Sequence, residues 1–213
     1  MKKIISLILT LALCVSLSAC GSTKKSESAA VSAADGENIK QETQNSEEST
    51  TEPQNAGKVL VVYFSVTGNT KKIAENIADG LGAKLSEIVP KEPYTSADLD
   101  YNDDNSRSTL EMNDTSARPE ISGTIDDFEQ YDTVFIGYPI WWGQAPRIMD
   151  TFVESYDFTG KTVIPFCTSA SSRIGSSADT LEELAGSGTW KKGQRFKGNE
   201  SVDKVTEWAE QFN

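Results

Sequence analysis

Histidine is absent from the 213 residues of this chain, and cysteine occurs only as Cys14, Cys20 and Cys167. Without histidine, a Ser-His-Asp triad, a Cys-His pair and a histidine-ligated metal site are all excluded. Cys167 alone falls in the part that we expect to fold, so no disulfide forms within that part. We interpret Cys167 as a small buried residue at a strand end rather than a redox thiol. Any chemistry must therefore come from a cofactor, or be absent.

Basic residues are also scarce. The chain has 20 Lys and Arg against 32 Asp and Glu, which gives a net charge of −12. Proteins bind nucleic acid by neutralising its phosphates with Lys and Arg, so this charge balance argues against such a role. We expect no nucleic-acid partner.

The N-terminal residues have the features of an export signal. Two lysines precede an apolar run over residues 4–17, which is too short to span a membrane comfortably. The run ends in Leu17-Ser18-Ala19-Cys20, which resembles the bacterial lipobox. We expect residues 1–19 to be a lipoprotein signal peptide and Cys20 to carry the lipid that holds the protein at the outer side of the cytoplasmic membrane. The alternatives are an ordinary secretory leader or a buried helix.

Large apolar side chains are nearly missing from the segment that follows. Residues 20–56 are rich in Ser, Thr, Glu, Gln, Asn and Ala. Such a composition does not bury enough apolar surface to offset the entropy of ordering, so we expect a disordered tether. The remaining residues, 57–213, have the length of one compact domain.

Apolar runs and helical patterns alternate within this domain. The run at 58–64 is almost wholly apolar, as in a strand buried on both faces of a parallel sheet. We expect strands at 58–64, 84–89, 133–138, 162–167 and 189–196, and helices at 69–81, 145–156, 177–185 and 201–212. This alternation predicts an α/β fold with a doubly wound, five-stranded parallel sheet and helices on both faces. Because the second and fifth strands are the more polar, we place them at the edges, in the order 2-1-3-4-5. Residues 90–120 are acidic and irregular, and connections of this length tend to be functional or disordered.

The loop after the first strand has the composition of an anion site. Ser65-Val66-Thr67-Gly68-Asn69-Thr70 leads directly into a helix. Hydroxyls and free backbone N–H groups at a helix start favour negative charge. Neither a P-loop lysine nor a GxGxxG motif is present, so the loop suits a single terminal phosphate. The alternative is a capped turn that binds nothing.

The loop after the third strand contains two adjacent tryptophans, Trp141 and Trp142. Both cannot point inward along an extended chain. Flat aromatic surface beside a cleft suits a planar ring system. The alternative places one tryptophan in the core and the other on the surface.

Together these loops resemble those of the flavodoxin-like family, in which a Thr/Ser-x-Thr-Gly-x-Thr loop grips the phosphate of FMN. The resemblance implies FMN as the cofactor. It assigns the phosphate to Ser65, Thr67, Gly68, Asn69 and Thr70, and the flavin ring to Pro139, Ile140, Trp141, Trp142 and Gly143. It assigns the pyrimidine end of the ring to Thr168, Ser169, Ala170, Ser171 and Gly175. No catalytic side chain and no metal ligand is implied.

The sequence departs from the family pattern at two positions and resembles some family members in two further segments. Ala170 and Arg173 stand where relatives tend to carry glycine, and both would be strained at positive φ. Arg173 either stabilises negative charge on reduced flavin or is simply solvated. The segments 91–94 (KEPY) and 117–120 (ARPE) resemble those of a group of bacterial flavodoxin-like proteins.

Three functions follow from these features. The first is an electron carrier that uses FMN at the outer side of the cytoplasmic membrane. The second is an FMN-dependent reductase of quinones or other small acceptors, and the third is a surface interaction domain that has lost flavin. Expected partners are redox proteins or small electron acceptors. Since cytosolic NAD(P)H is not available outside the membrane, we expect a membrane-borne electron donor.

Overall fold

The computed structural model describes residues 57–212. The predicted signal peptide, the lipidated Cys20 and the tether lie outside these residues. Within 57–212, no helix is both long and apolar enough to cross a membrane.

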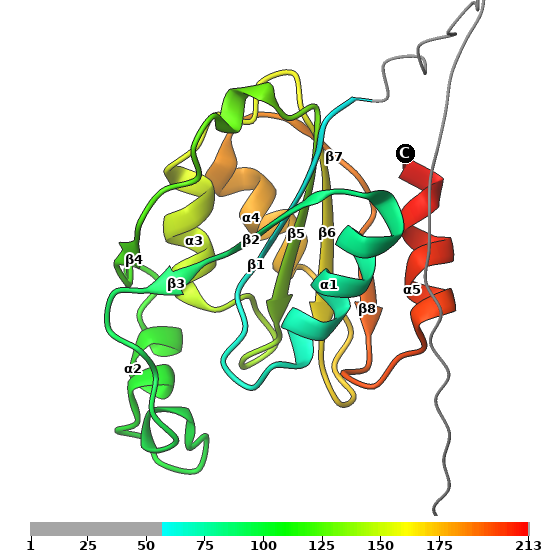
Figure 1. Cartoon of the computed structure of the whole chain (residues 1–213). Helices are drawn as coiled ribbons and strands as arrows, with labels where there is room; N and C mark the ends of the chain where they lie inside the picture. The colour runs from blue at the N-terminus through cyan, green and yellow to red at the C-terminus, as the bar shows by residue number, and fades with distance from the viewer. Residues whose placement is uncertain (1–56, 213) are drawn as a thin grey trace, which may run out of the picture. The chain divides into compact units, whose positions relative to one another are not determined.

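A parallel sheet forms the centre of the domain (Figure 1). Its strands are β1 (Val59–Tyr63), β2 (Lys84–Glu87), β5 (Thr133–Pro139), β6 (Thr162–Thr168), β7 (Thr189–Trp190) and β8 (Gln194–Phe196). The order is β2-β1-β5-β6-β7, and β8 also pairs with β6. All these pairings are parallel. The predicted α/β class and the predicted strand order are thus confirmed.

The fifth strand differs from the single strand predicted over 189–196. Val163 pairs with Trp190, and Phe166 pairs with Gln194. Between these two pairs β6 advances by three residues, whereas the outer strand advances by four. One extra residue interrupts the ladder, as in a β-bulge, and divides the strand into β7 and β8.

Successive residues of β1 point to opposite faces of the sheet and enter two separate cores. Leu60 and Val62 pack with residues of α3 (Arg147–Glu154) and α4 (Ser177–Ala185). Val61 and Tyr63 pack with residues of α1 (Asn69–Leu81) and α5 (Val202–Ala209). Both faces are therefore covered by helices, which is why the strand is apolar throughout.

The helices lie close to their predicted positions. α3 is shorter than the predicted 145–156 because Pro146 occupies its N-cap, and α5 is followed by a 3₁₀ turn, η3 (Glu210–Phe212). α1 ends at Gly82, whose φ of 61° favours glycine.

Residues 90–120, predicted to be irregular, contain short ordered elements. β3 (Val89–Pro90) pairs antiparallel with β4 (Ile121–Ser122). Between these strands lie a 3₁₀ turn, η1 (Ala97–Leu99), and a helix, α2 (Arg107–Asn113). We call residues 91–120 the insertion. A further 3₁₀ turn, η2 (Phe128–Gln130), precedes β5.

Candidate functional site

The loops that follow β1, β5 and β6 meet at one edge of the sheet, because parallel strands share the direction of their carboxyl ends (Figure 1). Backbone hydrogen bonds hold these loops together beyond the strands. The amide of Phe64 donates to the carbonyl of Gly137 over 2.9 Å, and the amide of Ile140 donates to the carbonyl of Thr168 over 3.0 Å. In open parallel sheets, ligands bind at this edge near the switch in strand order.

The start of α1 has no side-chain cap. Its N-cap is Gly68, with a φ of 82°, and its first turn holds no acidic residue. Thr67 is exposed, and its hydroxyl accepts a hydrogen bond of 3.1 Å from Asn69 Nδ2 instead of capping the helix. The first N–H groups of the helix and its positive dipole end therefore face outward, which suits an anion better than a capped turn does.

Thr70 connects two of the loops. It is buried, and its Oγ1 lies 2.7 Å from Oγ1 of Thr168, the last residue of β6. This hydrogen bond fixes the beginning of α1 against the end of β6.

The two tryptophans lie in one tight hairpin turn. Trp141 and Gln144 exchange backbone hydrogen bonds of 3.0 and 2.9 Å, and Trp142 and Gly143 between them have φ values of 47° and 79°. A two-residue turn of this kind needs positive φ at both central residues. Trp141 is half-buried and packs against Phe64, with ring centroids 5.7 Å apart, whereas Trp142 is 45% exposed. One tryptophan thus joins the core while the other lies at the surface.

Both tryptophans nevertheless line the same cavity, which has a volume of about 440 Å³. We call it the aromatic cavity. Its walls come from the loop after β1, the loop after β5 and the insertion. The lining residues are Ser65, Val66, Thr67, Thr70, Leu99, Tyr101, Ser108, Pro139, Ile140, Trp141 and Trp142.

A second cavity, of about 400 Å³, lies next to it and shares Thr67 and Pro139. We call it the polar cavity. Its lining residues are Thr67, Asn69, Pro139, Thr168, Ser169, Ala170, Lys197, Gly198 and Asn199. The loop from β8 to α5 therefore contributes to the site. A Cβ on Gly198 would lie 2.2 Å from Asn69 Oδ1 and 2.9 Å from Asn69 Cβ, so a larger residue here would have to displace the Asn69 side chain.

The structure brings together most of the residues predicted for the site. Four predicted site residues line neither cavity: Gly68, Gly143, Ser171 and Gly175. Arg173 is exposed to solvent. Within residues 57–212, the only non-glycine residues with positive φ are Asp127 and Trp142, so Ala170 and Arg173 are not strained in this way. Arg195 holds the loop after β6 by donating from Nη2 to the carbonyl of Ser169 over 2.7 Å.

Two parts of the site had no signal in the sequence. One is the wall formed by Leu99, Tyr101 and Ser108 of the insertion, and the other is the segment 197–199. The segment 197–199 falls between the strand predicted at 189–196 and the helix predicted at 201–212, and no prediction assigned it to the site.

Cys167 is fully buried, and this burial raises the pKa of its thiol to about 12. The thiol is therefore protonated at neutral pH, as expected for a packing residue rather than a nucleophile.

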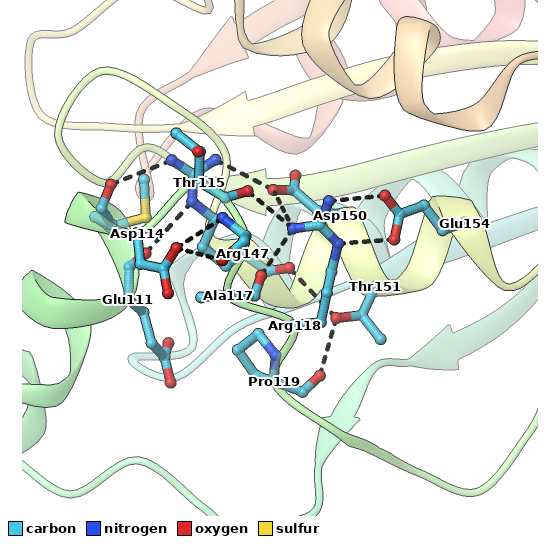
Figure 2. A network of polar contacts seen from close by, with 12 residues as sticks. Glu111, Asp114, Thr115, Ala117, Arg118, Pro119, Arg147, Asp150, Thr151 and Glu154 are labelled. Atoms are coloured by element: carbon cyan, nitrogen blue, oxygen red, sulfur yellow. Dashed lines mark hydrogen bonds and ion pairs between the residues drawn. The ribbon is translucent and has the colours of Figure 1, made fainter.

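A network of charged residues fastens the insertion to α3 (Figure 2). Arg147 Nη1 lies 3.2 Å from Asp150 Oδ2, while its Nη2 donates to the carbonyl of Met112 over 3.1 Å. Arg118 pairs with both carboxylate oxygens of Glu154, at 2.7 and 2.8 Å. We call these four charged residues the Arg118–Arg147 network.

The network combines buried and half-exposed groups. Burial raises the pKa of the Asp150 carboxyl above its ordinary value, although both arginines act in the opposite direction. The hydrogen bond from Arg118 lowers the pKa of Glu154. Thr151 of α3 also donates a hydrogen bond to the carbonyl of Pro119 in the insertion. Within the insertion, Arg118 donates to the carbonyls of Thr115 and Ala117.

This geometry defines an open, doubly wound α/β protein whose ligand site lies at the switch in strand order. Residues 58–212 match the sequence profile of the flavodoxin family. The chain belongs to this family.

Solved structures agree with the assignment. A protein from Bacteroides eggerthii, assigned as a flavoprotein, is 45% identical over 72% of this chain and 96% of its own, with a TM-score of 0.68. A flavoprotein from Lactobacillus acidophilus, crystallised in complex with FMN, is 28% identical over 71% of this chain and 99% of its own, with a TM-score of 0.53.

Two curated relatives match over a shorter region. Both are named NAD(P)H dehydrogenase (quinone). The protein from Archaeoglobus fulgidus is 29% identical over 49% of this chain, and that from Acidovorax ebreus is 30% identical over 46%. The matches span about half the length of these relatives, 52% and 45% respectively.

Proposed function

We propose that this protein binds FMN and serves as an electron-transfer protein of the flavodoxin type. The observation that carries the proposal is the uncapped start of α1, where Thr67 lies between the aromatic and the polar cavity. An anion-binding helix start next to an aromatic wall matches the two chemically distinct ends of FMN. The FMN complex of the L. acidophilus flavoprotein supports the same cofactor.

Each part of the site has a role in this proposal. The phosphate would be held by the first N–H groups of α1, by the hydroxyl of Thr67 and by the side-chain amide of Asn69. The flavin would lie along the hairpin that carries Trp141 and Trp142, and Ser169 and Ala170 would contact its polar edge. The buried hydroxyl of Ser108 and the close approach of Gly198 to the Asn69 side chain fit a site that is shaped around a ligand.

FMN supplies one- and two-electron transfer when bound, and the protein supplies binding, orientation and electrostatics. The titratable side chains that line the two cavities are Tyr101 and Lys197, within the part of the chain that the structure describes. Neither is buried, so neither is set apart as a proton donor by its surroundings. The walls therefore hold and shield the flavin, which is what an electron carrier needs.

The second candidate is an FMN-dependent reductase of quinones or other small acceptors. The names of the two curated relatives favour it, as does the exposed rim of the aromatic cavity at Tyr101 and Trp142. Saturable steady-state turnover with quinones supports the reductase. Electron exchange that occurs only with partner proteins supports the carrier.

An FMN titration tests the proposal directly. We expect the purified chain to take up one FMN, to quench flavin fluorescence and to show a visible flavin spectrum after gel filtration. Protein that stays colourless after incubation with FMN contradicts both redox functions and leaves the third candidate, a surface interaction domain without flavin.

We further propose that Cys20 anchors the domain at the outer side of the cytoplasmic membrane, where a membrane-borne donor reduces it. The support comes from the sequence alone: the leader, the lipobox-like segment and the polar residues 20–56. Shortening residues 21–56 to a few residues is expected to slow reduction in membrane vesicles, and an unchanged rate contradicts the idea.

The strained residue Trp142 gives a prediction that separates stability from binding. Asparagine tolerates positive φ better than tryptophan, so Trp142→Asn is expected to raise the unfolding free energy of the FMN-free protein by about 1 kcal/mol. The same change removes aromatic surface from the cavity and is expected to weaken FMN binding by about fivefold. Urea denaturation and fluorescence titration measure the two effects.

Trp142→Phe is the matched control, because it keeps an aromatic ring at the same φ. We expect it to leave the unfolding free energy within about 0.5 kcal/mol, and the FMN affinity within about twofold, of the values for the unaltered protein. A Trp142→Asn protein that binds FMN as tightly as the unaltered chain removes this residue from the flavin site.

A further inference from the structure

The insertion contributes one buried polar side chain to the aromatic cavity that has no hydrogen-bond partner among residues 57–212. Ser108, the second residue of α2, lies in the wall of this cavity with 1% of its surface exposed. Its Oγ is buried and makes no hydrogen bond with any of residues 57–212. Buried hydroxyls are normally paired, so one without a partner in the wall of a ligand cavity calls for an explanation.

The neighbouring hydroxyls of the same helix are paired. Ser106 is the N-cap of α2, and its Oγ lies 2.8 Å from Oγ1 of Thr109. The capping of this helix is therefore complete without Ser108, and a purely local structural role for the Ser108 hydroxyl has no support in the contacts.

The backbone that carries Ser108 is held from two sides. Arg147 donates to the carbonyls of Glu111 and Met112, over 3.4 and 3.1 Å, and so attaches the end of α2 to α3. Glu111 accepts hydrogen bonds of 2.5 Å from the hydroxyl of Tyr94 and 2.7 Å from Nε of Arg107. Figure 2 shows how the side chain of Arg147, the first residue of α3, contacts the insertion.

Tyr94 connects this attachment to the tryptophan hairpin. Its ring centroid lies 5.3 Å from that of Trp141 and 5.8 Å from that of Phe64, with edge-to-face geometry in both pairs. The wall that bears Ser108 and the wall that bears Trp141 therefore share one packed aromatic cluster. Side chains held in this way are positioned before a ligand arrives, which lowers the entropy lost on binding.

We propose that the insertion is a wall of the FMN site and that Ser108 Oγ forms a hydrogen bond with the bound FMN. This inference rests on the proposed function and adds a binding residue outside the three loops of the flavodoxin pattern. Ser108 bears the buried hydroxyl among the three residues of the insertion that line this cavity, whereas Tyr101 is 74% exposed.

Ser108→Ala tests the proposal through two measurements with opposite expected signs. Removing a hydroxyl that has no partner in the described part of the chain should leave the urea midpoint of the FMN-free protein unchanged or raise it. Removing the hydrogen bond to the ligand should weaken FMN binding by about three- to tenfold in a fluorescence titration of the full chain. A merely structural serine would show the reverse pattern, with lower stability and unchanged affinity.

Ser96→Ala is the matched control, since Ser96 is an exposed serine of the same insertion outside both cavities. We expect it to change neither quantity. Unchanged FMN affinity in Ser108→Ala, with the unaltered chain binding FMN, overturns the inference and leaves the proposed function standing. Failure of the unaltered chain to bind FMN overturns the proposed function itself.

Discussion

Thr67→Glu is expected to weaken FMN binding by about 100-fold while riboflavin binding changes by no more than a few-fold. Thr67 is exposed and lies between the two cavities, directly before the uncapped start of α1. A carboxylate there repels the phosphate and competes for the same N–H groups, and the loss of one charge-assisted hydrogen bond together with the repulsion amounts to about 2.7 kcal/mol. Riboflavin lacks the phosphate and does not meet this repulsion.

The substitution is not expected to damage the fold, because a negative side chain near a helix N-terminus interacts favourably with the helix dipole. Thr67→Gln is the matched control, since it has nearly the same size without the charge. We expect it to reduce FMN affinity by less than tenfold. Equal losses for FMN and riboflavin in Thr67→Glu would place the phosphate elsewhere.

Arg147→Met is expected to reduce the free energy of unfolding by about 3 kcal/mol, measured by urea denaturation at pH 7. The substitution leaves Asp150, which is 2% exposed, with Arg118 at 3.9 Å as its remaining cationic partner. It also removes the hydrogen bonds that Arg147 donates to the carbonyls of Glu111 and Met112. Breaking a buried ion pair on one side is costly because a charge stays behind without its partner.

The loss should depend on pH. Burial raises the pKa of Asp150 in the folded protein, so the folded state binds this proton more tightly than the unfolded state does. Stability from this group is present below the unfolded pKa and is lost as pH rises through the folded pKa. Arg147→Met removes a positive charge that lowers the pKa of Asp150, so the pKa of this carboxyl rises further in the variant. Because a protonated Asp150 carries no charge that needs a partner, the destabilisation by Arg147→Met should be smaller under acidic conditions than at pH 7.

Two further variants check the cause of this destabilisation. Arg118→Met breaks a half-exposed pair with Glu154 and is expected to lose no more than about 1 kcal/mol. Arg147→Met combined with Asp150→Leu removes both buried charges and should recover much of the loss. A double variant as unstable as Arg147→Met would show that the carbonyl contacts, and not the charge pair, are responsible.

The central sheet could be predicted from the sequence because its signals are long and redundant. The run at 58–64 is apolar at both odd and even positions, which indicates burial on both faces, and the structure places those positions in two cores. The helix at 69–81 has a clear apolar face followed by glycine, and α1 has these bounds. The polar character of the second and fifth strands was enough to place them at the edges.

The insertion could not be predicted because its elements are too short to show a period. β3 and β4 have two residues each and are joined by pairing between Val89 and Ser122, far apart in the chain. α2 spans seven residues, about two turns, in an acidic segment whose helix is held by buried contacts with Arg147. Tertiary contacts, not local propensity, decide the structure here.

The site was predictable where one loop carries its own chemistry and not where the fold assembles it. Hydroxyls around Gly68 and the tryptophan pair identify their loops directly. Ser108 and Gly198 are ordinary residues in sequence. Their importance arises because the fold places Ser108 in the same cavity as Trp141, and Gly198 beside Asn69. The hairpin turn at Trp142 could not be predicted either. Positions with positive φ are recognised in a sequence by glycine or asparagine, and here a bulky residue occupies one.

The contact between Gly198 and Asn69 joins two segments that lie far apart in the chain. A ribosome makes a chain from its N-terminal end, so Asn69 emerges long before the residues that border it on the other side. Thr168, which fixes the start of α1 through Thr70, also follows much later. The polar cavity is thus completed only after Gly198 has been made, and a nascent chain that stops short of Gly198 lacks one side of this cavity.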